Sequence, residues 1–137
     1  MSNWSIGEIQ SYTLYNDNGN KRRVFQNFLD AEAGDIAICY EATPTKQVVA
    51  LAKIYKKNDG KHIYFQKTES LTYPIDYSIL KNCEELNNME FFANPNGSLF
   101  KLTQNEYDFI MDIIRDTNPI KRTNENIGRY TDEDFLN

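Results

Sequence analysis

Residues 35–67 read DIAICYEATPTKQVVALAKIYKKNDGKHIYFQK, and this stretch decides the fold. Residues 35–41 are too apolar on both faces for a strand at the surface. Residues 46–55 form a second run rich in Val, Leu and Ile. Asn58-Asp59-Gly60 is a strong hairpin signal, and residues 61–67 follow it as a third strand. The stretch therefore predicts a β-meander of three strands.

Helical patterns flank this meander on both sides. Residues 20–31 carry one apolar stripe at helical spacing and predict a short helix. Residues 76–81 predict a short helical turn. Residues 103–116 predict the clearest helix, because they open with Thr-Gln-Asn-Glu, a capping box, and continue with apolar residues at helical spacing. Together with a last strand expected at 98–102, these elements predict an α+β fold.

Length and composition are those of a single globular domain. The chain has 137 residues, of which 40% are apolar, 13% aromatic and 26% charged. A chain of this length buries about two-thirds of its unfolded surface, so a core forms without metal or disulfide staples. We expect residues 1–118 to form this domain. Residues 119–137 are typical of a linker, and their final apolar residues predict the start of a following domain.

The sequence indicates a protein of the cytoplasm. No apolar run approaches the roughly 18 residues that a membrane helix needs. The first residues show neither the basic nor the apolar region of a secretory signal. Cys39 and Cys83 form no CxxC motif, and we expect both to be reduced thiols.

Motifs of enzyme chemistry are absent from the sequence. It has no glycine-rich phosphate loop, no Gly-x-Ser-x-Gly motif and no Cys/His pair at a productive spacing. The single histidine, His62, has no Cys, His or carboxylate partners at metal-ligand spacing. We therefore expect a binding domain without catalytic residues, metal or cofactor.

The net charge of −5 argues against a protein that simply coats nucleic acid, but the charge is unevenly distributed. Residues 1–67 carry nine basic and seven acidic side chains, whereas residues 68–137 carry six and thirteen. A polyanion would therefore bind to residues 1–67 rather than to residues 68–137. The candidate phosphate contacts there are Lys21, Arg22, Arg23 and Lys67.

Aromatic residues lie beside polar turns and close to these cations. A ring that stacks on a nucleobase contributes about 1–3 kcal/mol, which offsets the few kcal/mol needed to unstack a base from a duplex. For any single ring the alternative is packing in the core. The rings concerned are Trp4, Tyr12, Tyr15, Tyr40, Tyr64, Phe91 and Phe92.

Three segments carry a resemblance to a known family: residues 40–54 (YEATPTKQVVALAKI), 73–80 (YPIDYSIL) and 94–103 (NPNGSLFKLT), the last followed by Glu106-Tyr107. Together they resemble EVE domains, over about residues 4–118 in the same order. They are most similar to the EVE-type domains at the N-terminus of McrB-like modification-dependent restriction GTPases. Residues 130–136 resemble the lead-in to the AAA+ GTPase domain of such proteins.

The resemblance implies a PUA-like fold, related to YTH and ASCH domains, with a small partly open β-barrel, short flanking helices and a C-terminal helix. It implies a non-catalytic module that flips a methylated cytosine or adenine of double-stranded DNA into an aromatic pocket. The module would be the specificity domain of an McrBC-like restriction system in phage defence. An McrC-like nuclease subunit would be the partner of the parent protein. GTP and Mg²⁺ would belong to the motor domain alone, and the isolated domain would be monomeric.

The resemblance also assigns residues to the pocket. Tyr40, Glu41 and the turn from Thr43 to Lys46 would border it, and Trp4 and the segment from Tyr12 to Tyr15 would form walls. Tyr64 joins this set as a further aromatic candidate, and Lys21, Arg22 and Arg23 would meet phosphate. One departure from the family pattern is that no aromatic-rich strand precedes Trp4-Ser5. The expected consequence is a lower affinity.

Two other functions remain open from the sequence. A reader of modified or structured RNA, as in YTH and PUA relatives, would depend on the 2′-hydroxyl that DNA lacks. A protein-interaction or regulatory domain would dock a partner through the acidic second half and would show no salt-dependent binding to any polyanion. A PUA-like nuclease has no supporting residues.

Overall fold

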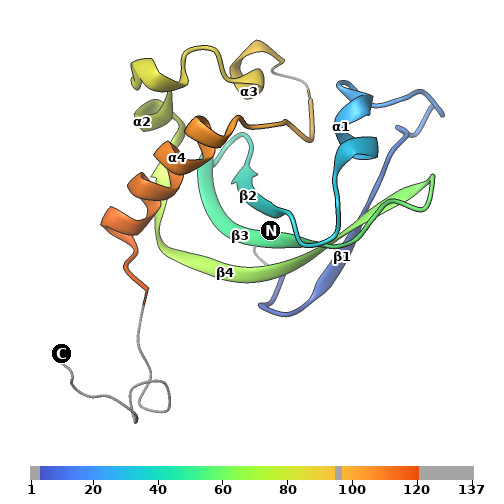
Figure 1. Cartoon of the computed structure of the whole chain (residues 1–137), viewed down its shortest axis with the longest axis horizontal. Helices are drawn as coiled ribbons and strands as arrows, with labels where there is room; N and C mark the ends of the chain where they lie inside the picture. The colour runs from blue at the N-terminus through green and yellow to red at the C-terminus, as the bar shows by residue number, and fades with distance from the viewer. Residues whose placement is uncertain (1–3, 95–96, 121–137) are drawn as a thin grey trace, which may run out of the picture.

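A computed structural model describes residues 4–94 and 97–120. Its centre is a four-stranded antiparallel sheet in the order β1-β4-β3-β2. The strands are β1 (Ile9–Thr13), β2 (Ile36–Glu41), β3 (Gln47–Lys56) and β4 (His62–Asp76). The long strands β3 and β4 curve strongly, so that the sheet forms an open, barrel-like shape with β1 and β2 as its two edges (Figure 1). The predicted α+β class and open sheet are confirmed.

The helices lie at the two ends of this curved sheet (Figure 1). One end carries α1, and the other carries α2, α3 and α4. Their bounds are α1 (Phe25–Asp30), α2 (Tyr77–Lys81), the 3₁₀ turn η1 (Glu84–Leu86), α3 (Glu90–Ala93) and α4 (Gln104–Thr117).

The hairpin between β3 and β4 forms where the sequence predicts it. Asp59 Oδ1 accepts hydrogen bonds from the backbone N–H groups of Lys61 and His62, at 2.9 and 2.8 Å. Gly60 has a φ of 93°, which glycine adopts without steric cost. The hydrogen bonds to Asp59, including one from the Tyr64 hydroxyl, hold the pKa of its carboxyl well below the usual range.

Strand β4 is much longer than predicted, because it continues through Pro74 to Asp76. Val48 of β3 pairs with Ile75, and Ala50 pairs with Ser70, so β4 bulges between these two pairs. Proline lacks an N–H and is tolerated in a strand at such a bulge. The predicted helical turn at 76–81 then follows as α2.

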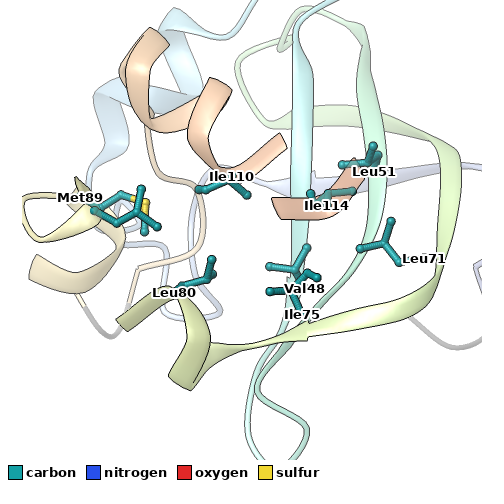
Figure 2. Packing of buried hydrophobic residues seen from close by; sticks show 9 residues of the cluster. Val48, Leu51, Leu71, Ile75, Leu80, Met89, Ile110 and Ile114 are labelled. Carbon is teal, nitrogen blue, oxygen red and sulfur yellow. The ribbon is translucent and has the colours of Figure 1, made fainter. Parts of the chain in front are cut away.

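Helix α4 packs against the end of the sheet where the largest core cluster lies. Its predicted capping box is confirmed: Thr103 Oγ1 accepts from Glu106 N at 3.1 Å, and Glu106 Oε1 accepts from Thr103 N at 2.9 Å. Ile110 and Ile114 are buried and point into a cluster with side chains of β3, β4, α2 and the η1–α3 segment (Figure 2). The other buried members are Val48, Leu51, Leu71, Ile75, Leu80, Leu86 and Met89.

Two sequence predictions need correction, and one strand was missed. Residues 98–102 do not form a strand, because side chains of Asn27 and Glu90 take up the carbonyl of Leu99 and the N–H of Lys101. The helix predicted at 20–31 begins only at Phe25. The strand β1 was not predicted, since all five of its residues are exposed and no apolar alternation marks it.

Some predictions fall partly or wholly outside the described residues. Residues 95–96, in the segment 94–103 that carries the resemblance, are not described, and residues 121–137, with the predicted lead-in to another domain, are also outside. Both cysteines are free thiols, with Cys39 buried and Cys83 half-buried. Over the described ranges, no helix combines the length and the apolar character needed to cross a membrane.

Candidate functional site

A cleft of about 970 Å³ lies inside the curved sheet, between its two edge strands. Its volume is at the upper end of the ~300–1,000 Å³ typical of ligand pockets. On one side it is lined by residues 10–12 of β1, and on the other by residues 36–40 of β2. Helix α1 and the segment 97–104 complete its rim. Consecutive residues of β2 line the cleft because the unpaired edge of this strand faces it.

Aromatic rings lie at the α1 end of the cleft. Tyr12 of β1 is parallel to Phe28 of α1, with ring centroids 6.5 Å apart and planes 9° apart. Phe28 is fully buried, whereas Tyr12 is 42% exposed. The guanidinium of Arg22 lies 4.7 Å from the centre of the Tyr12 ring. This end therefore offers an accessible ring that is backed by the core and flanked by a cation.

A second group of rings lies at the opposite end of the cleft. Tyr40 at the end of β2 meets Phe91 of α3 edge to face, with centroids 4.9 Å apart. Phe91 meets Phe100 in the same manner at 5.3 Å. Burial, followed by the neighbouring Tyr77, raises the pKa of the Tyr40 hydroxyl. This hydroxyl therefore stays neutral at physiological pH and can donate a hydrogen bond.

A polar network ties α1 to the segment 97–104 along the rim of the cleft. Asn27 Nδ2 donates to Glu90 Oε1 at 2.5 Å and to the carbonyl of Leu99 at 3.0 Å. Glu90 Oε1 also accepts from the backbone N–H of Lys101 at 2.8 Å. Lys101 Nζ in turn donates to Asp30 Oδ2 at 3.1 Å. Together these contacts hold the irregular segment beside α1.

Charged side chains that line the cleft give it a small excess of negative charge. They are Asp30, Asp35 and Lys101. Hydrogen bonds from Gln26 and then Lys101 lower the pKa of Asp30, so this carboxyl is ionised at neutral pH. The lining therefore favours a neutral or donor-rich group over an anion.

Three of the eight residues assigned to the base pocket, Trp4, Tyr12 and Tyr40, line this one cleft. Of the two further candidate rings, Phe91 lines the cleft and Phe92 does not. The accessibility of Trp4, Tyr12 and Tyr40 differs. Trp4 is only 5% exposed, packs against Cys39 and Ala52, and donates from Nε1 to the carbonyl of Glu8 at 2.7 Å. It forms part of the cleft floor rather than a free wall.

The other five predicted base contacts lie outside the cleft: Tyr15, Glu41, Thr43, Lys46 and Tyr64. Tyr64 is on β4 between the inward-facing Ile63 and Phe65, so it points to the opposite face of the sheet. Tyr15 packs against Phe25 at 5.4 Å, in the turn ahead of α1. Lys46 lies in the turn between β2 and β3, 5.8 Å from the ring of Tyr77.

The predicted phosphate contacts divide in the same way. Arg22 lies at the rim of the cleft, where Nε donates to the carbonyl of Thr13 at 2.7 Å. Lys21 and Arg23 are exposed beside it. The prediction that Lys67 contacts phosphate is wrong, because Lys67 is 8% exposed and its ammonium donates to the carbonyl of Trp4 at 2.7 Å. This buried ammonium is used inside the fold and is not accessible to a phosphate.

Several lining residues were missed by the sequence analysis. Asn27 and Asp30 are on a predicted helix, but the sequence pattern there marked only the apolar residues and gave no reason to select these two polar ones. Lys101 reaches Asp30 over 71 residues of sequence, and nothing local announces such a contact. The alternation of β4 could have selected Phe65 over Tyr64, since Ile63 and Phe65 share one face.

Side chains that could hold a metal ion do not gather anywhere in the described part of the chain, where no three His, Cys, Asp or Glu residues come together. Cys39 lines the cleft, but burial raises the pKa of its thiol to about 11. It is therefore protonated and weakly nucleophilic at neutral pH.

Comparison with known proteins gives similarity of fold. The sequence matches no family model and no curated protein. Among solved structures, the fold is similar to the NMR structure of Rpa0253 from Rhodopseudomonas palustris, with a TM-score of 0.63 and 16% identity, covering 77% of this chain and 76% of that one. It is also similar to a hypothetical protein from Leishmania major, with a TM-score of 0.65 and 16% identity, covering 79% and 82%. These similarities place the chain in a fold shared with both proteins.

Proposed function

We propose that this chain is a PUA-like, EVE-type module that binds double-stranded DNA containing a modified base. The flipped base enters the cleft between β1 and β2. The observation that carries the proposal is this cleft, which is open to solvent on one side and lined by aromatic rings at both ends. The resemblance in residues 40–54, 73–80 and 94–103 supports the choice of ligand.

Stacking at the α1 end would supply part of the free energy that base flipping needs. Stacking of a base on an aromatic side chain contributes about 1–3 kcal/mol, and extrusion from a duplex costs a few kcal/mol. Tyr12 is the ring best placed for this stack, because it is 42% exposed and is backed by Phe28. The Arg22 guanidinium, which lies over the Tyr12 ring, would move aside to admit the base. Hydrogen bonds to the base edge supply the remainder.

The distribution of charge supports a ligand that places its base inside the cleft and its phosphates outside. The carboxylates of Asp30 and Asp35 line the cleft and disfavour a phosphate inside it. The cations Lys21, Arg22 and Arg23 lie outside, beside the Tyr12 end. This arrangement fits a neutral base inside the cleft, away from phosphate charge, and the DNA phosphates outside it on the cations of residues 21–23.

The family resemblance supports a wider role as well. The module would work in the cytoplasm as the specificity domain of a modification-dependent restriction protein. Its motor domain would bind GTP and Mg²⁺ and would recruit an McrC-like nuclease subunit. Within this chain, the role is recognition without catalysis.

The test is a titration of the chain against matched duplexes at one fixed salt concentration, since affinity for DNA depends on salt. The set contains unmodified, 5-methylcytosine, 5-hydroxymethylcytosine and N6-methyladenine DNA, with a single-stranded RNA control. We expect one modified duplex to bind severalfold or more tightly than the unmodified one. Equal binding to all duplexes, tighter binding to RNA, or no binding would contradict the proposal.

A matched pair of variants locates the site. Tyr12→Ala removes the cleft ring and should weaken binding of the modified duplex by about tenfold or more. Tyr55→Ala removes a strand tyrosine that is 48% exposed but lies outside the cleft, and it should leave binding nearly unchanged. Equal effects of the two substitutions would place the ligand elsewhere.

A further inference from the structure

We infer that Asn27 determines which bases the cleft accepts, by selecting bases with an exocyclic amine that keeps at least one N–H. This inference rests on the proposed function, because it names the chemistry that the same cleft would read. Asn27 lines the cleft from α1, and Phe28, which backs the Tyr12 ring, is the next residue.

The orientation of the Asn27 amide is fixed by its surroundings. Glu90 Oε1 and the carbonyl of Leu99 are both acceptors, and both lie within hydrogen-bond distance of Nδ2. The NH₂ group must therefore face them, and both of its N–H donors are used. Among the described residues, no donor bonds Asn27 Oδ1. The amide thus presents a preoriented acceptor, rather than a donor, to a ligand.

The charged groups of the cleft point to the same preference. Asp30 and Asp35 add carboxylate acceptors, and the ammonium of Lys101, a strong donor in the lining, is bonded to Asp30. Adenine and cytosine carry an exocyclic amine, whereas thymine and hypoxanthine carry a keto oxygen at the same position. A keto oxygen facing Asn27 Oδ1 would leave two acceptors opposed, so such bases are disfavoured.

Glu90 is the positioning residue for this acceptor. It does not line the cleft, yet it holds the amide of Asn27 and the backbone of Lys101 with the same oxygen. Half-burial of Glu90 keeps this contact partly shielded from solvent. Without it, the Leu99 carbonyl alone would hold the Asn27 amide, and the acceptor would be less firmly oriented.

The experiment compares pairs of probe bases in which one member keeps an amine N–H and the other member has none. Each is placed opposite an abasic site in the same duplex, so that base pairing does not contribute to flipping. The pairs are 5-methylcytosine with thymine, and N6-methyladenine with N6,N6-dimethyladenine, which has no N–H left. For the modified base that binds, we expect the amine-bearing member to bind about tenfold more tightly than its partner.

Variants separate recognition from folding. Asn27→Leu should reduce the ratio of the two affinities, amine-bearing base over its partner, to near one, mainly because the amine-bearing base binds more weakly. Lys101→Met breaks the link between α1 and the 97–104 segment without removing the Asn27 acceptor, and it should preserve the preference. Retention of the preference in Asn27→Leu would overturn the inference. If Asn27→Leu does not fold, the wild-type protein still tests the inference. Equal affinity of the wild type for both members of a pair of probe bases would overturn the inference as well.

The outcomes also distinguish this inference from the proposed function. Tighter binding of a modified duplex with no dependence on the amine would overturn the role of Asn27 and leave the function standing. No preference for any modified duplex would overturn both. Binding of a trimethyl-lysine peptide in place of DNA would also overturn both, because an aromatic cleft with carboxylates suits a quaternary ammonium as well.

Discussion

Replacement of Asn118 by alanine should destabilise the fold by an amount that the structure allows us to work out. Asn118 follows α4, is 6% exposed, and lies against the bulge of β4. Its Nδ2 donates to the carbonyl of Tyr73 at 2.9 Å, and its Oδ1 accepts from the N–H of Tyr73 at 2.8 Å. Residues 71–74 have no paired partner in β3, and the Asn118 side chain bonds both backbone groups of Tyr73 within this gap.

The expected loss follows from these two hydrogen bonds and a third, from Nδ2 to Thr117 Oγ1 at 3.0 Å. Each bond contributes about 0.5–1.5 kcal/mol net, and groups left unpaired add to the cost unless water reaches them. Because Tyr73 is 63% exposed as a residue, water can replace part of the lost pairing at its backbone. We expect Asn118→Ala to lower the free energy of unfolding by about 2–3 kcal/mol, and Tm by about 10 °C.

The assay is urea unfolding followed by fluorescence of Trp4. This is the single tryptophan of the chain, and it is buried, so its emission reports loss of the native core. Asp116→Asn, at an exposed position of the same helix, is the control and should change stability by less than about 0.5 kcal/mol. A similarly small change for Asn118→Ala would refute the view that its amide supports the bulge.

Three further predictions follow from burial and ionisation. Trp4→Ala should lower the free energy of unfolding by about 3–5 kcal/mol, because a buried aromatic side chain is removed. Urea unfolding followed by circular dichroism measures this loss, and an unchanged stability would contradict the burial of Trp4 in the core. Hydrogen bonds from Arg115 lower the pKa of Glu69, so its stabilising contribution is present above about pH 4.5 and is lost as the pH falls through the lowered pKa. Unfolding between pH 6 and pH 2.5 should therefore show a smaller loss of stability for Glu69→Gln than for the wild type, and equal slopes would contradict the pairing. With a thiol reagent at pH 8, Cys83 should react in the native protein while Cys39, with a pKa of about 11, reacts only after unfolding; fast reaction of both thiols would show that Cys39 is accessible.

The elements that could be predicted from sequence are those whose signals are local. The apolar runs of β2 and β3 and the capping box of α4 each lie within a short window, and the structure bears them out. β1 gave no signal because its residues are exposed on both faces and it forms by pairing with β4, about 50 residues away. The continuation of β4 through Pro74 was missed because the bulge is supported by Asn118, on another element.

The candidate site was less predictable for the same reason. Trp4, Tyr12 and Tyr40 were selected as aromatic residues near turns, and the curvature of the sheet brings them to one cleft. Tyr64 was selected by the same criterion, but strand alternation places it on the other face. The rim network of Asn27 and its partners joins positions more than 60 residues apart, so it depends on the tertiary fold.

The most direct test of the account maps the ligand onto the cleft. An isotope-labelled sample of the chain is titrated with the duplex that binds best, and amide chemical shifts are followed by NMR. We predict that the perturbed amides cluster at residues 10–12, 27–30, 36–40 and 97–104, with weaker changes at the Lys21–Arg23 turn. Perturbations concentrated on residues 111–117 of α4, or on the outer-face residues Tyr55 and Tyr64, with the cleft residues unchanged, would contradict the claim that a base enters this cleft.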